Sequence, residues 1–405
     1  MKNRLSLVLS VALLGSVSAF AADSLQDALK GGKVSGDVAV TYETRNIKEK
    51  DANPNLDKIY YQDTAYSVGS IGLNYETGSF YGFSANVGMR AYANIWQDNN
   101  KLQTKKGSGD ASERFWEDGM SNKRMDLANA YLAYTLKDVM VVKVGRQVLA
   151  TEWMTKYHDA VSAYITPFER AQIEAIYSYK RYRVDAREHF NYGELNGNDG
   201  IYKLGFTYEI FNGVKAKVYG MTAPDSHDLY GGKISADLKA GDVGYGGLVH
   251  YMETREDKAK TADKEDGKML ELVGYASYAG YKGTLGYVTT GKKNGWGSAA
   301  NYGDTVVPFE EGDAMYERDA RTLYGMISKS FFDVSLTALY GQTKYRMPAA
   351  DSKEYKSNEL SFWASYNFTK NLSADLGYSY INTSDNDTNK LPDLNQVNLT
   401  LTYKF

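Results

Sequence analysis

The sequence contains no cysteine and only four histidines among its 405 residues. Without cysteine there is no disulfide framework and no thiolate metal site. The histidines lack the spacing of a metal-binding pair, and none stands in a Ser-His-Asp nucleophile pattern. The nearest approach to one is His227, within Pro-Asp-Ser-His-Asp, which a polar turn explains better. We therefore expect no catalytic residue, no metal and no cofactor, and we do not expect an enzyme.

After its first 21 residues the sequence also lacks an uninterrupted apolar run of about 18 residues, the length that a transmembrane helix needs. Its mean hydropathy is −0.49. A membrane protein is still allowed, because a transmembrane strand alternates apolar and polar residues and has a low mean hydropathy. Basic residues are not in excess, since 47 Lys and Arg face 50 Asp and Glu, a net charge of −3. A nucleic-acid partner is therefore not expected.

The first 21 residues have the features of a secretory signal peptide. Basic residues precede an apolar segment at 5–17, and a small-x-small sequence follows at 19–21. We expect cleavage near Ala21 and Ala22, and hence export from the cytoplasm. Residues 22–32 are expected to form a short periplasmic lead or helix, because apolar residues recur there at helical spacing and two glycines follow.

Tyrosine and glycine are abundant, with 35 and 38 residues, whereas there are only 6 prolines. Apolar and polar residues alternate over many segments, so a strand there has one apolar and one polar face. The clearest segments are 33–45, 81–90, 172–180, 202–209, 359–368 and 372–380. In the first of them Asp37, Glu43 and Arg45 share the polar face. Because these charges must contact water, we expect the interior of the fold to be wet.

The alternation continues through 395–405, the last segment of the sequence. Its apolar face consists of Val397, Leu399, Leu401, Tyr403 and Phe405. An open sheet edge cannot lie in lipid, so a membrane barrel needs a last strand that pairs with its first. We therefore expect an all-β fold over 33–405, a closed transmembrane antiparallel β-barrel. We expect the barrel-assembly machinery to engage this closing strand.

The expected connections alternate between short and long, as the periplasmic turns and external loops of outer-membrane barrels do. Short turns are expected at 76–79, 136–139, 180–181, 211–214, 240–242, 279–281, 331–333 and 369–371. Long loops are expected at 46–64, 95–124, 148–169, 190–200, 222–231, 254–267, 291–320, 344–357 and 384–394. These eight turns and nine loops connect about 18 strands, with 16 as the alternative. A barrel of this size encloses an aqueous channel.

Inward parity places many basic residues on the wall of this channel. They are Arg45, Arg90, Arg183, Arg187, Lys203, Lys215, Lys217, Lys233 and Lys282. Such a ladder of cations would guide anions or carboxylates by weak, repeated binding. Acidic residues share the same parity, namely Asp37, Glu43, Glu174, Asp185, Glu209, Asp237 and Asp375. A selective ladder and a generally solvated interior therefore both stay open.

The segment 148–169 is more apolar than the other expected loops. A loop of this composition would not lie flat in solvent, so we expect it to fold into the barrel and narrow the pore. It would present Glu152 and Asp159 to cations on the wall, which are Arg90, Arg146 and Arg183. An external loop packed on its neighbours, or a subunit interface, is the alternative. The acidic segment 291–320 is interpreted as a solvated loop or an acidic mouth.

Residues 126–153 read DLANAYLAYTLKDVMVVKVGRQVLATEW. This stretch resembles OprD-like porins, including the major-outer-membrane-porin branch, in which Tyr-Leu-x-Tyr and a turn lead to a Gly-Arg/Lys-Gln motif and an inward-folding loop. Gly145, Arg146 and Gln147 match the motif, the segment 166–169 resembles the end of the loop, and 25–45 is similar to the start of the same branch. The resemblance covers about residues 22–180 and continues by pattern to the last residue.

The resemblance implies an 18-stranded passive diffusion channel, often trimeric, whose third loop narrows the lumen. Carboxylate-selective members have an arginine ladder, whereas many matching positions here are lysine with acids between them. Arg146 shares the outward parity of Val142 and Val144, so a bulge or twist near Gly145 is needed to turn it inward.

We therefore expect a porin of a Gram-negative outer membrane, in contact with lipid and lipopolysaccharide. It would form a homotrimer and let small hydrophilic solutes and ions diffuse through its lumen. One alternative is a substrate-selective channel of the same family, for carboxylates or amino acids. Another is a surface adhesin or structural barrel with a plugged lumen, and an outer-membrane hydrolase is the third.

Overall fold

The structure is a computed structural model that describes residues 22–47, 63–98, 115, 124–257, 265–296, 302–303, 305–346, 353–383 and 393–405. The expected signal peptide at 1–21 lies outside the described residues. None of the helices in the described ranges is long and apolar enough to cross a membrane.

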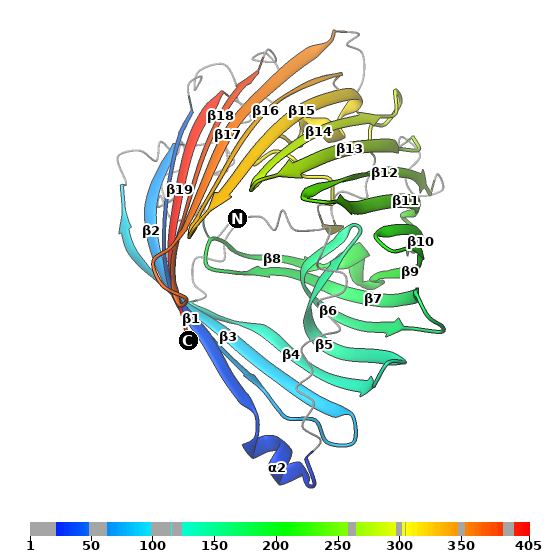
Figure 1. Cartoon of the computed structure of the whole chain (residues 1–405), viewed down its shortest axis with the longest axis vertical. Helices are drawn as coiled ribbons and strands as arrows, with labels where there is room; N and C mark the ends of the chain where they lie inside the picture. Colours follow the sequence, from blue (N-terminus) through cyan, green and yellow to red (C-terminus); the bar gives the residue numbers. More distant parts are fainter. Residues whose placement is uncertain are drawn as a thin grey trace.

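Eighteen strands form a closed antiparallel barrel, which confirms the predicted fold class (Figure 1). The wall strands are β1 (Lys33–Ile47), β2 (Thr64–Glu76), β3 (Phe83–Gln97), β4 (Met125–Leu136), β5 (Met140–Thr151), β6 (Met154–Ile165), β7 (Ala171–Val184), β9 (Ile201–Phe211), β10 (Val214–Ala223), β11 (His227–Ala240), β12 (Val243–Glu256), β13 (Lys268–Tyr278), β14 (Tyr281–Thr290), β15 (Arg318–Phe331), β16 (Val334–Arg346), β17 (Tyr355–Asn367), β18 (Leu372–Thr383) and β19 (Leu394–Lys404). Each wall strand pairs with the next one along the chain. A nineteenth strand, β8 (His189–Glu194), pairs with β7.

The ring closes where β1 pairs with β19, in a register that sets Tyr42 opposite Leu399. Gly36 and Phe405 extend this pairing through two backbone hydrogen bonds of 3.0 Å. The exposed apolar side chains of the last strand are Leu399, Leu401, Tyr403 and Phe405, with Val397 half-buried on the same face. Of the polar residues between them, Asn398 and Thr400 are buried and Thr402 is half-buried, whereas Lys404 at the end of the strand is exposed. The predicted closing strand is therefore confirmed.

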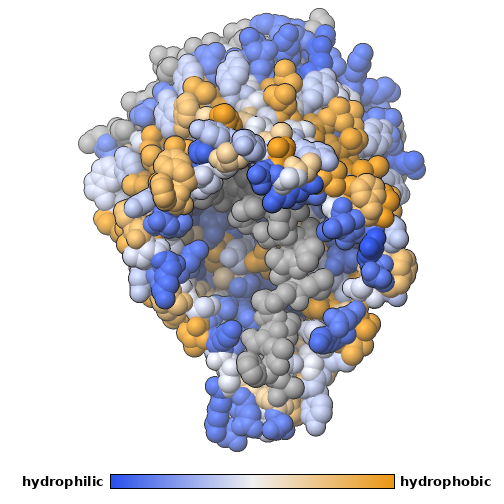
Figure 2. Space-filling view, in the orientation of Figure 1, coloured by the Kyte–Doolittle hydropathy of each residue, from blue (hydrophilic) through white to orange (hydrophobic). Residues whose placement is uncertain are grey.

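The outer face of the barrel is apolar. Exposed aliphatic and aromatic residues point outward from nearly every wall strand, among them Val38, Ile71, Val87, Leu132, Val144, Val161, Leu204, Val218, Ile234, Val249, Leu285, Leu323, Phe362 and Leu376. Figure 2 shows apolar residues spread over the wall, whereas hydrophilic residues gather at the top of the view. Water does not favour so large an exposed apolar surface, but lipid does.

Exposed aromatic residues form a ring at the end of the barrel where the short turns lie. They are Tyr81, Phe83, Phe168, Phe211, Tyr278, Tyr281, Phe331, Phe332, Tyr366, Phe368, Tyr403 and Phe405. Aromatic side chains favour the boundary between lipid and water, where one part of the ring is apolar and another is wet. We call this end the short-turn end and the other the loop end.

A short helix, α2 (Leu25–Lys30), lies at the short-turn end, within the segment expected to be a lead or helix (Figure 1). Ser24 caps it, since its hydroxyl accepts a hydrogen bond of 3.1 Å from the backbone N–H of Asp27. The carbonyl of Ala28 accepts a hydrogen bond of 2.9 Å from the backbone N–H of Gly78, in the β2–β3 turn. The helix is thereby tied to the wall.

The expected long loop at 148–169 is wrong, and so is the expected turn at 180–181. Strands β5 and β6 occupy most of the first segment and are joined by a two-residue turn, Glu152 and Trp153. The next short turn lies at 166–170, and β7 runs without a break through 180–181. The expected number of about 18 wall strands is nevertheless correct. The expectation omits β6 but counts β7 as two strands, so the two errors cancel. The apolar residues that suggested an inward loop belong to two wall strands, with Val148 and Val161 exposed outside and Leu149 buried inside.

Three connections at the loop end fold into the interior. They are the β5–β6 turn, the hairpin of β7 and β8 followed by the short helix η2 (Leu195–Asn198), and the β14–β15 connection with η4 (Asp313–Tyr316). The last of these was expected to be a solvated loop or an acidic mouth. That expectation is wrong, because Trp296, Val306 and Phe309 are fully or almost fully buried against the inner wall.

Candidate functional site

Three lysines of neighbouring strands form the centre of the candidate site. Lys203 lies on β9, Lys217 on β10 and Lys233 on β11, and the last two are directly opposite each other. Like charges in directly opposite positions destabilise a sheet. Two carboxylates compensate for this repulsion, Glu152 of the β5–β6 turn and Glu174 of β7. We call these five residues the lysine cluster.

The ion pairs of the lysine cluster are short and shared. Lys217 Nζ lies 2.5 Å from Glu152 Oε2 and 2.9 Å from Glu174 Oε1. Lys203 Nζ lies 3.2 Å and 3.0 Å from the same two oxygen atoms, and Lys233 Nζ contacts Glu152 Oε1. Three ammonium groups and two carboxylates leave one positive charge in the cluster. These ion pairs thus hold the β5–β6 turn against β9, β10 and β11.

Glu152 is the acid that all three lysines contact, and its side chain is 5 % exposed. Burial alone would raise the pKa of its carboxyl group, but Lys233, Lys203 and Lys217 outweigh this effect and hold the pKa well below its usual range. Glu152 therefore stays ionised at neutral pH.

Gly205 of β9 makes room for the second carboxylate. Glu174 and Gly205 are opposite each other in the β7–β9 register. A Cβ atom at Gly205 would lie 2.6 Å from Glu174 Oε1 and 2.8 Å from its Cγ. The side chain of Glu174 therefore extends over this glycine to reach Lys203 and Lys217.

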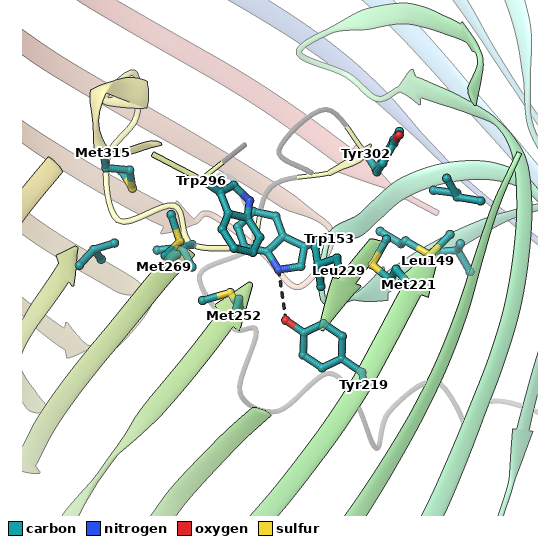
Figure 3. Close-up of a cluster of buried hydrophobic side chains, with 14 of the residues drawn as sticks. Leu149, Trp153, Tyr219, Met221, Leu229, Met252, Met269, Trp296, Tyr302 and Met315 are labelled. Atoms are coloured by element: carbon teal, nitrogen blue, oxygen red, sulfur yellow. Dashed lines mark hydrogen bonds between the residues drawn. The ribbon is translucent and has the colours of Figure 1, made fainter. Parts of the chain in front are cut away.

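Trp153, the second residue of the β5–β6 turn, has a left-handed backbone with φ of 59° and is fully buried. Its backbone N–H donates a 2.6 Å hydrogen bond to Thr305 Oγ1, and its indole Nε1–H donates one of 3.2 Å to Tyr219 Oη. Its ring centroid lies 4.7 Å from that of Trp296 (Figure 3). The β14–β15 connection and Tyr219 of the wall therefore both hold the turn in place.

The β14–β15 connection covers an apolar zone of the inner wall at the loop end (Figure 3). The buried side chains of this zone include Leu149, Met221, Leu229, Met252, Met269 and Met315. If the connection were displaced, these side chains would be exposed to water, which is unfavourable in proportion to their apolar area. The zone therefore holds the connection inside the barrel.

The β7–β8 hairpin crosses the lumen to the far wall, where β1 and β19 meet (Figure 1). Thr41 Oγ1 of β1 donates a 2.8 Å hydrogen bond to the carbonyl of Ala186 at its tip. Arg187, also at the tip, donates one of 2.6 Å to Asn398 Oδ1 of β19. The hairpin thus divides the cross-section of the lumen.

Two adjacent acids of the β14–β15 connection join this hairpin to the wall. Glu310 pairs with Arg187 at 3.1 Å, and Glu311 pairs with Arg45 of β1 at 2.7 Å. The carboxylate of Glu359 on β17 accepts backbone hydrogen bonds of 2.6 Å from Glu310 N and 3.2 Å from Glu311 N. We call Glu310, Glu311 and Glu359, together with Arg45 and Arg187, the acidic latch. Arg45 and Arg187, expected as pore-wall cations, therefore hold an inward connection in place.

The remaining predicted constriction residues form three other ion-pair groups. Asp159 pairs with Arg146 at 2.8 Å, and the same guanidinium lies 3.3 Å from Asp126 and 3.6 Å from the ring centroid of Tyr182. Arg90 pairs with Asp37 at 2.5 Å, and Arg183 pairs with Glu188. Glu152 and Asp159 therefore pair with different cations. Asp159 pairs with Arg146, as expected. Glu152 contacts the three lysines instead of the expected arginines.

The irregularity expected at Gly145 is present. Its φ is 121°, and a Cβ atom there would lie 2.2 Å from the carbonyl oxygen of Ala130. Only glycine fits this conformation and this close approach. The kink allows Arg146 to reach Asp126 and Asp159.

The last two predicted wall cations lie nearer the short-turn end. Lys215 precedes Lys217 by two residues on β10 and has the same inward parity. Lys282 shares the parity of the buried Thr284, and its Nζ lies 3.9 Å from the ring centroid of Tyr275. Within the described ranges, no group of three or more His, Cys, Asp or Glu residues is placed to hold a metal ion.

No protein-family description matches the sequence, and no curated protein is similar to it in sequence. Solved structures are similar in fold. Acinetobacter baumannii OccAB1 superimposes with a TM-score of 0.74 at 12% identity, covering 94% of this chain and 98% of that one. Pseudomonas aeruginosa OccK9 (OpdG) gives a TM-score of 0.75 at 12% identity, with 93% and 99% covered. A BenF-like porin from Pseudomonas fluorescens Pf-5 gives 0.72 at 12% identity, with 93% and 99% covered. The predicted likeness to OprD-like porins is thus confirmed for the fold.

Proposed function

We propose that the protein is a porin of a Gram-negative outer membrane, through which small hydrophilic solutes and ions diffuse down their gradients. The observation that carries this proposal is the contrast between the two faces of the closed barrel. The outer residues are apolar and exposed, whereas the inner wall carries the ion pairs of the lysine cluster and of Arg90 and Arg146. Lipid favours the first face and water the second.

We assign the constriction to the level of the lysine cluster, where the β5–β6 turn meets β9, β10 and β11. Its net charge of one positive unit, with carboxylates beside each ammonium group, suits weak selectivity rather than strict exclusion of cations. Asp159, Arg146, Arg90 and Arg183 would line the lumen on the side of β3 to β7.

A substrate-selective channel for carboxylates or amino acids is the second candidate. The row of Lys203, Lys217 and Lys233 on adjacent strands favours it, because an entering carboxylate could replace Glu152 or Glu174 as their partner. A carboxylate substrate should then reduce the single-channel current at concentrations at which a neutral solute of the same size does not.

In this proposal the short-turn end faces the periplasm and the loop end faces the outside. The aromatic ring would lie at the inner lipid boundary, and lipopolysaccharide would contact the outer part of the wall. The strand β19 would be the element that the barrel-assembly machinery engages. A homotrimer is proposed from the family resemblance alone.

Single-channel recording in a planar bilayer under a salt gradient tests the proposal. Discrete current steps from folded, purified protein are expected, in groups of three if the assembly is a trimer. Folded protein that gives no current would contradict the channel. It would favour the other interpretation, a structural or adhesive barrel that its inward connections close.

A further inference from the structure

The Trp153 indole forms a hydrogen bond to the first of three contacting side chains on the wall, which lie in a row beside the lysine cluster. Trp153 Nε1 is 3.2 Å from Tyr219 Oη on β10, and this hydroxyl is 2.8 Å from His250 Nε2 on β12. His250 Nδ1 lies 3.5 Å from Glu271 Oε2 on β13. Tyr219, His250 and Glu271 are all buried. The dashed line in Figure 3 marks the first of these contacts.

The chemistry of the indole fixes the direction of the first hydrogen bond in this row. An indole N–H can only donate, so the oxygen of Tyr219 accepts from Trp153. The Tyr219 hydroxyl keeps its own proton, which it can donate to His250 Nε2 at 2.8 Å, while Nδ1 of the same ring faces the Glu271 carboxylate at 3.5 Å. Tyr219 Oη therefore joins Trp153 to His250, and a connected buried polar network of this kind stabilises one conformation.

Tyr219 also contacts the lysine cluster. The Nζ atom of Lys203 lies 4.9 Å from the centroid of its ring, within the range of a cation–π contact. One residue of a wall strand thus contacts both the turn that carries Glu152 and a lysine that Glu152 binds. The further contacts of Trp153, with Thr305, Trp296 and Tyr316, come from the β14–β15 connection rather than from the wall.

We infer that Tyr219 is a positioning residue of the constriction, supported from behind by His250 and Glu271. Through Trp153 it keeps the β5–β6 turn docked, so that Glu152 stays among the three lysines. The effect on ion selectivity rests on the proposed channel function, whereas the effect on docking of the turn does not.

The substitution Tyr219→Phe removes the hydroxyl and keeps the ring beside Lys203. Loss of the hydrogen bond from Trp153, the one that joins the wall to the turn, should lower the ratio of docked to undocked turn about fivefold. Whenever the turn is undocked the lysines lack Glu152, so the permeability ratio should move toward anions, as in Glu152→Gln but by less. In the Glu152→Gln background, Tyr219→Phe should add nothing. An additive effect in the double variant would overturn the inference.

A second measurement does not depend on conductance. Met154 follows Trp153 and is fully buried, and the sequence has no cysteine, so Met154→Cys introduces a single thiol at the turn. A charged methanethiosulfonate should label this thiol about fivefold faster when Tyr219→Phe is present, because labelling follows opening of the turn. Equal labelling rates would overturn the inference even in a conducting protein. Faster labelling of a protein that never conducts would support the inference and refute the channel.

Two further variants serve as controls. Tyr378→Phe removes a hydroxyl that donates to Asn395 at 3.1 Å, from a position with the outward parity of the exposed Leu376, and should leave both readouts unchanged. A change there would indicate general loosening of the barrel and overturn the inference. His250→Phe removes the contacts of this ring with Tyr219 and with Glu271, keeps the Tyr219 hydroxyl, and should shift both readouts in the same direction as Tyr219→Phe. It replaces Tyr219→Phe if far-ultraviolet circular dichroism shows that this variant does not fold.

Discussion

Lys217 and Lys233 stand directly opposite each other on the inner wall, and each forms an ion pair with Glu152 from the β5–β6 turn. Two ammonium groups in directly opposite positions repel each other, so the pairing of these wall strands depends on the carboxylate of the turn. The turn supplies the negative charge that the wall needs, and the wall fixes the place of the turn. We therefore propose that Glu152 sets the charge of the constriction.

The first prediction concerns pH. Because the folded-state pKa of Glu152 is depressed, the stabilisation from its ion pairs is present above the unfolded-state pKa and is lost as pH falls through the folded-state value. The difference in permeability ratio between the wild type and Glu152→Gln should stay constant from about pH 7 to about pH 5 and narrow only well below about 4.3. Reversal potentials at a series of pH values measure it. A narrowing above pH 5 would contradict the depressed pKa.

The second prediction concerns Gly205. In Gly205→Ala the added methyl group would meet Glu174 and push its carboxylate away from Lys203 and Lys217. The permeability ratio should shift toward anions, by less than in Glu152→Gln. The matched control is Gly274→Ala, where nothing lies within 4 Å of the added Cβ. Identical reversal potentials for both alanine variants would show that Glu174 does not depend on this glycine.

The third prediction concerns the acidic latch. Glu359→Gln replaces one acceptor oxygen by an NH₂ group that faces a backbone N–H, so at least one of the two hydrogen bonds from Glu310 and Glu311 is lost. Unfolding in urea should show a loss of about 1–3 kcal/mol, and protease should cleave the β14–β15 connection faster.

A suitable control for the latch is Glu253→Gln, which removes an exposed pair with Lys268 and should change stability by less than about 1 kcal/mol. If Glu359→Gln matched this control in both stability and cleavage, Glu359 would not hold the connection.

The fourth prediction concerns the β7–β8 hairpin. Thr41 and Ala186 join its tip to β1, so Thr41→Cys with Ala186→Cys brings two thiols together in a protein that has no other cysteine. Since the hairpin is already docked on the far wall, conductance should be the same in the oxidised and reduced protein. A conductance that rises on reduction would mean that the hairpin leaves the wall during transport.

The barrel itself was predictable from the sequence because two solvents dictate one simple pattern. Lipid outside and water inside require alternation with a period of two, and Val38, Val40, Leu399 and Leu401 follow it closely. The need to close the ring predicted the pairing of the last strand with the first. The kink at Gly145 was predictable because Arg146 had the wrong parity for a polar interior.

The inward connections were not predictable by the same rule. Leu149 and Met154 face an apolar zone inside the barrel, while Val148 and Val161 face outward, so the alternation of β5 and β6 is hidden. The sequence of this segment therefore indicates an apolar loop. In β7 the polar pair at 180–181 resembles a turn, but it belongs to the part of the strand that extends into the lumen and pairs with β8.

The acidic latch joins residues far apart in the sequence, since 266 positions separate Arg45 from Glu311 and 123 separate Arg187 from Glu310. No local pattern indicates such partners. One signal was present, because this connection contains Trp296, Val306 and Phe309, although it is less apolar than the segment 148–169. The composition of the connection therefore indicated that it is buried, although not which residues it contacts.

The reversal potential of Glu152→Gln under a salt gradient, compared with that of the wild type, tests the central claim most directly. Removal of this charge raises the net charge of the lysine cluster from one to two positive units. An ion passing at about 4 Å in water would feel about 1 kcal/mol, so the permeability ratio should shift toward anions about fivefold. An unchanged reversal potential in a folded, conducting variant would contradict the claim that Glu152 sets the charge of the constriction.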